Sequence, residues 1–146
     1  YPVISSGAYC HPGSFERLLG KREDFITKYG EDTDYERARR WFSLETQVHA
    51  STPRTFIWQT VEDDVVPVQN SLLLVNALVE HGIPVEYQLY PKGVHGLSLS
   101  TEEVVEPEKK RGVDLHIADW FERAIDWLLY SEDSISSTNL ECGKNE

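Results

Sequence analysis

The chain has 146 residues, of which 40% are apolar and 11% aromatic, enough for a buried core and too many for a wholly disordered protein. Its formal net charge is −11, and the one basic cluster is Lys109-Lys110-Arg111, so the composition argues against a nucleic-acid-binding surface. No apolar run approaches the roughly 18–20 residues that span a bilayer, and we expect no membrane partner.

The N-terminal third predicts one short strand followed by short helices. Val3-Ile4 is a buried-strand candidate that ends at Ser5-Ser6-Gly7. The chain begins inside this strand and contains no methionine, which indicates a piece of a longer protein. Helices are predicted over Ser14–Gly20, Glu23–Tyr29 and Tyr35–Trp41, the first with a glycine stop.

The middle of the chain predicts a strand, a helix and a second strand. Thr55–Val61 is rich in β-branched and aromatic residues, and Pro84–Tyr90 alternates apolar and polar residues. Between them, Ser71–His81 predicts a helix that ends at Gly82. Its expected apolar face is Leu74, Val75, Leu78 and Val79. This alternation is typical of a parallel α/β sheet with flanking helices, in which about three strands need partner strands from outside the chain.

The C-terminal part predicts one long helix between two polar segments. Residues 98–114 are charged and predict an exposed loop, and Leu115–Leu129 predicts a helix. The expected apolar face of this helix is Ala118, Phe121, Ile125 and Leu128, and Trp58, Trp120 and Trp127 are expected to be packing residues. We therefore expect a domain over residues 1–130 and a polar, disordered tail over residues 131–146.

An acidic cluster and a histidine follow two consecutive predicted strands. Residues 60–67 read Thr-Val-Glu-Asp-Asp-Val-Val-Pro, and residues 91–96 read Pro-Lys-Gly-Val-His-Gly. An acid and then a histidine in these places form the second half of a Ser-acid-His triad in the chain order of α/β-hydrolases. The nucleophile should precede them, but no Gly-x-Ser-x-Gly occurs in the sequence. The chain therefore predicts a chemistry whose nucleophile it does not contain.

Several sequence blocks together resemble the bacterial α/β-hydrolases grouped with acetyl esterases and acetylxylan esterases. The resemblance runs from residue 1 to about residue 129, in the order of that family. The blocks are Tyr1–Ile4, His11–Ser14, Leu18–Gly20, Thr52–Trp58, Asp63–Ser71, Tyr90–Leu97 and His116–Trp120.

The resemblance implies the C-terminal half of an α/β-hydrolase fold, in a protein of roughly twice this length. It places Asp63, four residues before Pro67, on the catalytic acid and His95 on the base, and no residue here matches the serine. It implies a serine carboxylesterase acting on short-chain acyl esters, with an acetylated carbohydrate as one candidate substrate. It implies no cofactor and no metal.

The residues themselves leave alternatives open. Glu62 and Asp64 compete with Asp63 for the role of the acid, and the three together are a candidate site for a hard cation. Consecutive side chains point in different directions, which disfavours the cation. Asn70 and Ser71 are predicted to cap the following helix.

Two other functions also remain open. The chain is a non-catalytic fragment that self-associates through the bare sheet edge around Val3-Ile4, or it is one subunit of a two-chain hydrolase whose partner supplies the serine. In either case the chain alone is expected to show no esterase turnover.

Overall fold

A computed structural model of the chain describes residues 3–5, 16, 20–30 and 32–129. Three strands form one parallel sheet in the order β1-β2-β3. These strands are β1 (Val3–Ser5), β2 (Thr55–Thr60) and β3 (Val85–Tyr90). The parallel α/β arrangement that the sequence predicts is therefore confirmed.

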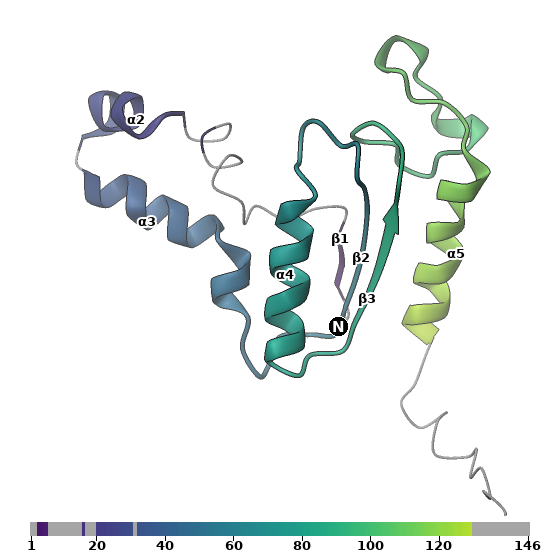
Figure 1. Ribbon diagram of the computed structural model, residues 1–146, viewed down its shortest axis with the longest axis horizontal. Helices are drawn as coiled ribbons and strands as arrows, with labels where there is room; N and C mark the ends of the chain where they lie inside the picture. Colours follow the sequence, from purple (N-terminus) through teal and green to yellow (C-terminus); the bar gives the residue numbers. More distant parts are fainter. Residues whose placement is uncertain (1–2, 6–15, 17–19, 31, 130–146) are drawn as a thin grey trace, which may run out of the picture.

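Helices lie on both faces of the sheet. Helix α4 (Gln69–Glu80) connects β2 to β3, and α5 (Leu115–Leu129) follows β3; Figure 1 shows the two helices on opposite sides of the strands. All six residues of β2 are buried, because this strand has neighbours on both edges and helices on both faces.

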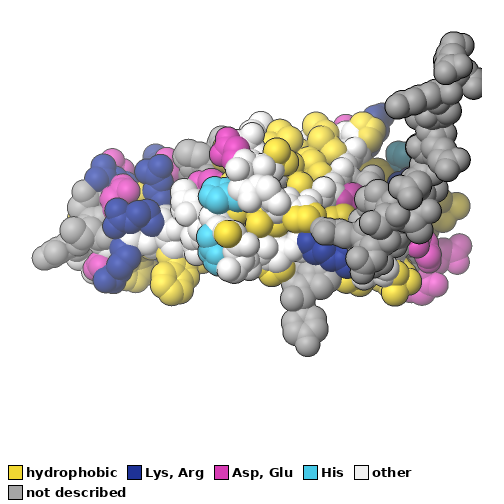
Figure 2. Space-filling model, turned by 90° about the horizontal axis from the view of Figure 1, so that it is seen from below, with side chains coloured by type: hydrophobic (Ala, Val, Ile, Leu, Met, Phe, Trp, Pro, Cys, Tyr) yellow, Lys and Arg dark blue, Asp and Glu magenta, His cyan; other side chains and the backbone are white. Residues whose placement is uncertain are grey.

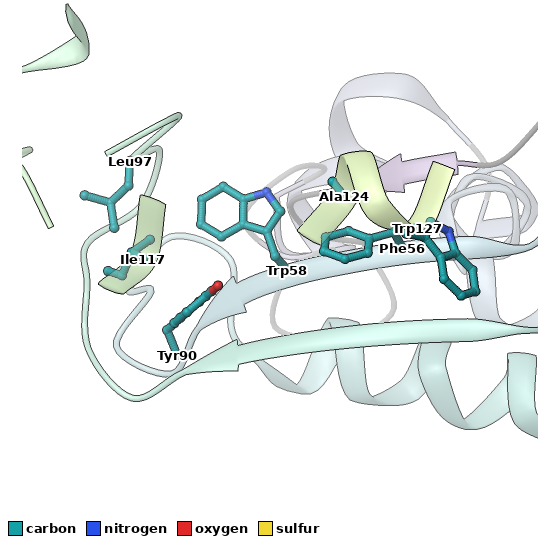
Figure 3. Packing of buried hydrophobic residues seen from close by; sticks show 7 residues of the cluster. All are labelled: Phe56, Trp58, Tyr90, Leu97, Ile117, Ala124 and Trp127. Atoms are coloured by element: carbon teal, nitrogen blue, oxygen red, sulfur yellow. The ribbon is translucent and has the colours of Figure 1, made fainter. Parts of the chain in front are cut away.

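The side chains of β2 divide between two hydrophobic clusters, as the alternation of a strand requires. Phe56 and Trp58 face α5, and Figure 3 shows Phe56 beside Ala124 and Trp127. The Trp58 ring stacks on Trp120, with centroids 4.8 Å apart and an interplanar angle of 12°. The expectation that these tryptophans are packing residues is confirmed.

The second cluster lies between the sheet and α4. Ile57 of β2 packs there against Ala77 and Leu78 of α4, together with Val48 and Ile83 from the adjoining loops. A short 3-10 helix, η1 (Leu44–Gln47), lies just before Val48 and contacts α4. The two clusters pack the two faces of β2, one against α5 and the other against α4.

Two helices project from the sheet as an arm. They are α2 (Arg22–Tyr29) and α3 (Asp32–Phe42), and Figure 1 shows them at the side of the molecule away from α5. Figure 2 shows Lys, Arg, Asp and Glu side chains gathered at this end. Of the helix predicted at 14–20, only Glu16 and Gly20 are among the described residues. The Gly20 amide donates a hydrogen bond to the Glu16 carbonyl at 3.0 Å. The tail predicted at 131–146 lies entirely outside the described residues.

The predicted apolar face of α5 is wrong in phase. The buried residues are Ile117, Ala124 and Trp127, whereas Phe121 and Leu128 are exposed in the described structure. The helix carries two apolar stripes, and the one bearing the tryptophans packs on β2. Trp120 stacks on Trp58, and Trp127 is buried in the same cluster, so the observed rotation of the helix goes with this aromatic packing.

The predictions for α4 also need correction. Val79 is exposed, while Asn70 and Ser71 are fully buried and do not cap the helix. The N-cap residue is Val68, without a side-chain cap bond. The Asn70 side chain donates instead to the Pro67 carbonyl at 2.9 Å, and Ser71 donates to Gln59 of β2. Asn70 thus bonds to the preceding loop and Ser71 bonds to the buried strand β2, and neither side chain is available as a helix cap.

Segments around β3 differ from the predicted pattern as well. Most of β3 is half-buried rather than alternating, since it lies at one edge of the described sheet. The predicted exposed loop at 98–114 contains two 3-10 helices, η2 (Glu102–Val104) and η3 (Pro107–Lys109), and a fully buried Ser100. Among the described residues, no helix has the length and apolar character to cross a membrane.

Candidate active site

Two loops meet at the carboxyl edge of the sheet. Residues 61–68 connect β2 to α4, and residues 91–97 follow β3. Because β2 and β3 are parallel neighbours, their carboxyl ends bring the two loops together (Figure 1). The Val61 amide donates to the Tyr90 carbonyl at 2.9 Å and extends the ladder to the start of both loops. The position of the site thus follows from strand order.

Asp63 and His95 contact each other across these loops. Asp63 Oδ2 lies 3.0 Å from His95 Nδ1, and the Asp63 side chain is only 6% exposed. The other carboxylate oxygen, Oδ1, accepts from the amides of Val65 at 3.0 Å and Val66 at 2.8 Å. Three donors therefore fix the orientation of the carboxylate. Such a carboxylate favours the tautomer of His95 that carries its proton on Nδ1.

The free side of the imidazole is Nε2. The His95 side chain is 39% exposed, and its Nε2 has no hydrogen-bond partner among the described residues. With Nδ1 donating to Asp63, Nε2 has a lone pair that can accept a proton from a reacting hydroxyl. The pair has the arrangement of an acid that orients a general base.

The neighbouring acids lie elsewhere. Glu62 is exposed and its Oε2 accepts from the Gly93 amide at 3.3 Å, and Asp64 is exposed. Of the three consecutive acids, Asp63 is the one whose carboxylate contacts His95. The described part of the chain has no group of three His, Cys, Asp or Glu side chains that could hold a metal ion. The cation alternative gains no support from this geometry.

Glycines on both sides of His95 shape its turn. Gly93 has φ 129° and Gly96 has φ 75°, conformations that a side chain disfavours. A Cβ atom at Gly93 would lie 2.7 Å from Leu97 Cδ1 and 2.8 Å from Thr60 Cγ2. Thr60 Oγ1 also donates to the Gly93 carbonyl at 2.7 Å. The turn packs against the end of β2, which sets where His95 projects.

A buried glutamine anchors the loop that carries Asp63. Gln59 is 2% exposed, and its Nε2 donates to the Val66 carbonyl at 2.6 Å. Its Oε1 accepts from the Ser71 hydroxyl at the start of α4. Sequence reasoning missed this residue. The available signal was a long amide side chain in a strand predicted to be buried, where a polar group needs partners.

A cavity of about 200 Å³ lies beside the pair. It is lined by Trp58, Gln59, Thr60, Asp63, Val94, His95, Gly96 and Ser98. Ser98 has φ 55°, and its carbonyl accepts from Trp120 Nε1 at 2.9 Å. No serine hydroxyl in the described residues bonds to His95. The site as described thus holds the Asp63 carboxylate and the His95 imidazole, in contact with each other, beside a small cavity.

The geometry agrees with a family assignment. The family model described as the prolyl oligopeptidase family matches residues 16–127. The chain belongs to this family. The family match covers both loops of the site, β2, β3, α2, α3, α4 and all but the last two residues of α5. The α/β-hydrolase resemblance drawn from the sequence is confirmed.

Individual relatives agree with the family. Endo-1,4-beta-xylanase B of Butyrivibrio fibrisolvens is 47% identical over 103 residues, which are 70% of this chain and 14% of that protein. A sugar hydrolase from Lactococcus lactis is 32% identical with a TM-score of 0.57, covering 66% of this chain and 37% of its own. An α/β-hydrolase enzyme from a Medee basin deep-sea metagenome library is 37% identical with a TM-score of 0.52. The match covers 56% of this chain and 33% of that enzyme's chain. The present chain thus spans less than two fifths of the length of each of these three relatives.

Proposed function

We propose that this chain carries the acid and the base of a serine hydrolase that cleaves short-chain carboxylic esters. The observation that supports the proposal is the 3.0 Å contact between Asp63 Oδ2 and His95 Nδ1, with Asp63 Oδ1 held by two backbone amides. These residues follow adjacent parallel strands, in the chain order that α/β-hydrolases use.

The proposed reaction proceeds through an acyl-enzyme. A serine hydroxyl attacks the ester carbonyl carbon while Nε2 of His95 takes its proton. The tetrahedral intermediate expels the alcohol, which receives that proton from His95, and leaves the acyl group on the serine. Water then attacks the acyl carbonyl, again losing a proton to Nε2, and the carboxylic acid departs as the serine regains its proton. Asp63 stays ionised throughout and stabilises the imidazolium.

The serine of this proposal lies outside the 146 residues, either on a continuous polypeptide or on a partner chain. The absence of Gly-x-Ser-x-Gly from the sequence is the reason. An acetylated carbohydrate is the proposed substrate class, and the names of a xylanase and a sugar hydrolase among the relatives support it. Fold alone does not choose a substrate, so the choice requires a direct assay.

The test begins with the reading frame directly upstream of Tyr1. We expect an in-frame Gly-x-Ser-x-Gly there, and the continuous protein should hydrolyse aryl acetates and acetylated xylan faster than esters of long acyl chains. An aryl phosphonate should label its serine, and His95→Gln should abolish both labelling and turnover. Unchanged turnover in His95→Gln would contradict the proposal. Turnover on aryl acetates without any on acetylated xylan would remove the carbohydrate assignment alone.

A further inference from the structure

Arg111 contacts the backbone of the proposed base. Its Nε donates to the carbonyl of His95 at 3.0 Å, and its Nη1 pairs with the carboxylate of Glu106. The side chain is 21% exposed although it comes from a segment that the sequence predicts to be an exposed loop. Long cationic side chains are rarely this covered without a defined contact. Arg111 is 16 residues from His95, so the contact is tertiary.

The backbone holds Arg111 in place. Glu106 and Arg111 form an isolated antiparallel bridge, with N···O distances of 2.9 and 3.1 Å. Lys110 lies in the left-handed region at φ 57° and turns the chain back. Hydrogen bonds from Lys109 and from Arg111 hold the pKa of Glu106 below its ordinary value. The guanidinium is thus fixed by a paired backbone and an ionised partner.

The turn that carries His95 leaves room for this guanidinium. A Cβ atom on Gly96 would lie 2.8 Å from Arg111 Cζ. Arg111 therefore occupies the space that a side chain at position 96 would take. The absence of a side chain at Gly96 and the position of Arg111 fit each other.

The loop of residues 91–97 has anchors on both sides of His95. Before His95, the Gly93 carbonyl accepts from Thr60 and the Gly93 amide donates to Glu62. On the C-terminal side of the His95 Cα atom, the His95 carbonyl oxygen accepts a hydrogen bond from Arg111 Nε. A charge-assisted bond at this point restrains the peptide that determines where the imidazole projects.

We propose that Arg111, held by Glu106, is a positioning residue that keeps the His95 ring aligned with Asp63. The inference rests on the proposed role of His95 as the base. Arg111 acts on the His95 carbonyl and does not reach the reacting atoms. Without it, the C-terminal side of the turn loses this restraint, and the ring exchanges between tautomers and rotamers.

The test is the tautomer of His95 in this chain, read from its two ring ¹⁵N shifts through the carbon-bound ring protons. The His95 signals are assigned by their absence in His95→Ala. In the unmodified chain, the neutral ring should carry its proton mainly on Nδ1. Arg111→Gln should raise the Nε2–H fraction at least threefold. Lys109→Gln is the matched control, since Lys109 lies on the same turn and pairs with the same Glu106 without contacting His95.

Arg111→Lys covers the case in which Arg111→Gln does not fold. A lysine presents a single ammonium in place of the planar guanidinium fork and cannot reproduce the separate Nε and Nη1 contacts, so the Nε2–H fraction should also rise. An unchanged tautomer in a folded Arg111 variant, or an equal shift in Lys109→Gln, would overturn the proposal. This measurement needs no turnover. A shifted tautomer in a protein that hydrolyses no ester would leave Arg111 as a positioning residue and overturn the proposed function alone.

Discussion

Replacing Gln59 with leucine tests the anchor beneath the site. Gln59 is 2% exposed and Ser71 is fully buried, so water cannot replace the two bonds that the glutamine amide makes. Leucine has a similar volume, and the loss is therefore mainly polar. The Val66 carbonyl and the Ser71 hydroxyl would each lose a partner, at about 1–3 kcal/mol per group. Added apolar burial offsets part of this cost, and we expect a loss of about 2–4 kcal/mol in the free energy of unfolding.

The double variant separates this mechanism from general core damage. Ser71→Ala alone leaves Gln59 Oε1 without its donor and should cost about 1–3 kcal/mol. In Gln59→Leu with Ser71→Ala, only the Val66 carbonyl loses a partner, whereas the two single variants together leave three groups without one. The total should therefore fall below the sum of the single losses by the cost of two such groups, about 2–6 kcal/mol. Urea denaturation of the four proteins measures each value.

An exposed position supplies the control. Gln69 lies at the start of α4 and is exposed, so Gln69→Leu should change stability by less than about 0.5 kcal/mol. Strict additivity of the two core substitutions would refute the reasoning. So would a cost for Gln59→Leu no larger than that of Gln69→Leu.

Three further predictions concern the turn, the nucleophile and the sheet edge. Gly96→Ala should destabilise the chain by about 1 kcal/mol more than Gly20→Ala, because both glycines have positive φ but only Gly96 faces Arg111; equal losses in urea denaturation would contradict this. The isolated chain should show no saturable turnover of an aryl acetate; turnover that His95→Ala abolishes would reveal a nucleophile within it, with Ser98 the first to test. The outer edge of β1 pairs with no other strand among the described residues, and light scattering over a concentration series should show dimers or larger species; a stable, cooperatively unfolding monomer would contradict it.

The sequence predicts the frame of the fold well because its signals there are local. β2 is a run of β-branched and aromatic residues, β3 alternates apolar and polar residues, and Gly82 follows the end of α4 with φ 68°. Parallel order then follows from the alternation of strands and helices. The contact of Asp63 with His95 is predictable for the same reason, since each residue follows one of two neighbouring strands.

The features that the sequence does not predict depend on tertiary packing. α5 offers two apolar stripes, and the one that is buried packs against Phe56 and Trp58 of β2, which lie far from it in the sequence. Gln59 bonds to a residue 12 positions away and Arg111 to one 16 positions away, at spacings that carry no helical or strand period. Asn70 and Ser71, at the start of α4, match the pattern of helix-capping residues but are buried and bond to Pro67 and Gln59 instead. Such anchors become visible only when the loops are placed.

In the proposed function, Asp63 orients His95 as the base of an ester hydrolase. The most direct measurement of this role is kcat/KM for an aryl acetate in the continuous protein that carries the serine, comparing Asp63→Asn with Asp64→Asn. The asparagine at position 63 presents an amide to Nδ1 and selects the wrong tautomer, so we expect a fall of about 10⁴-fold, as for the equivalent change in serine proteases. Asp64→Asn removes the same charge one residue away from the contact and should change kcat/KM less than about threefold. Equal losses in the two variants, or full activity in Asp63→Asn, would contradict the account.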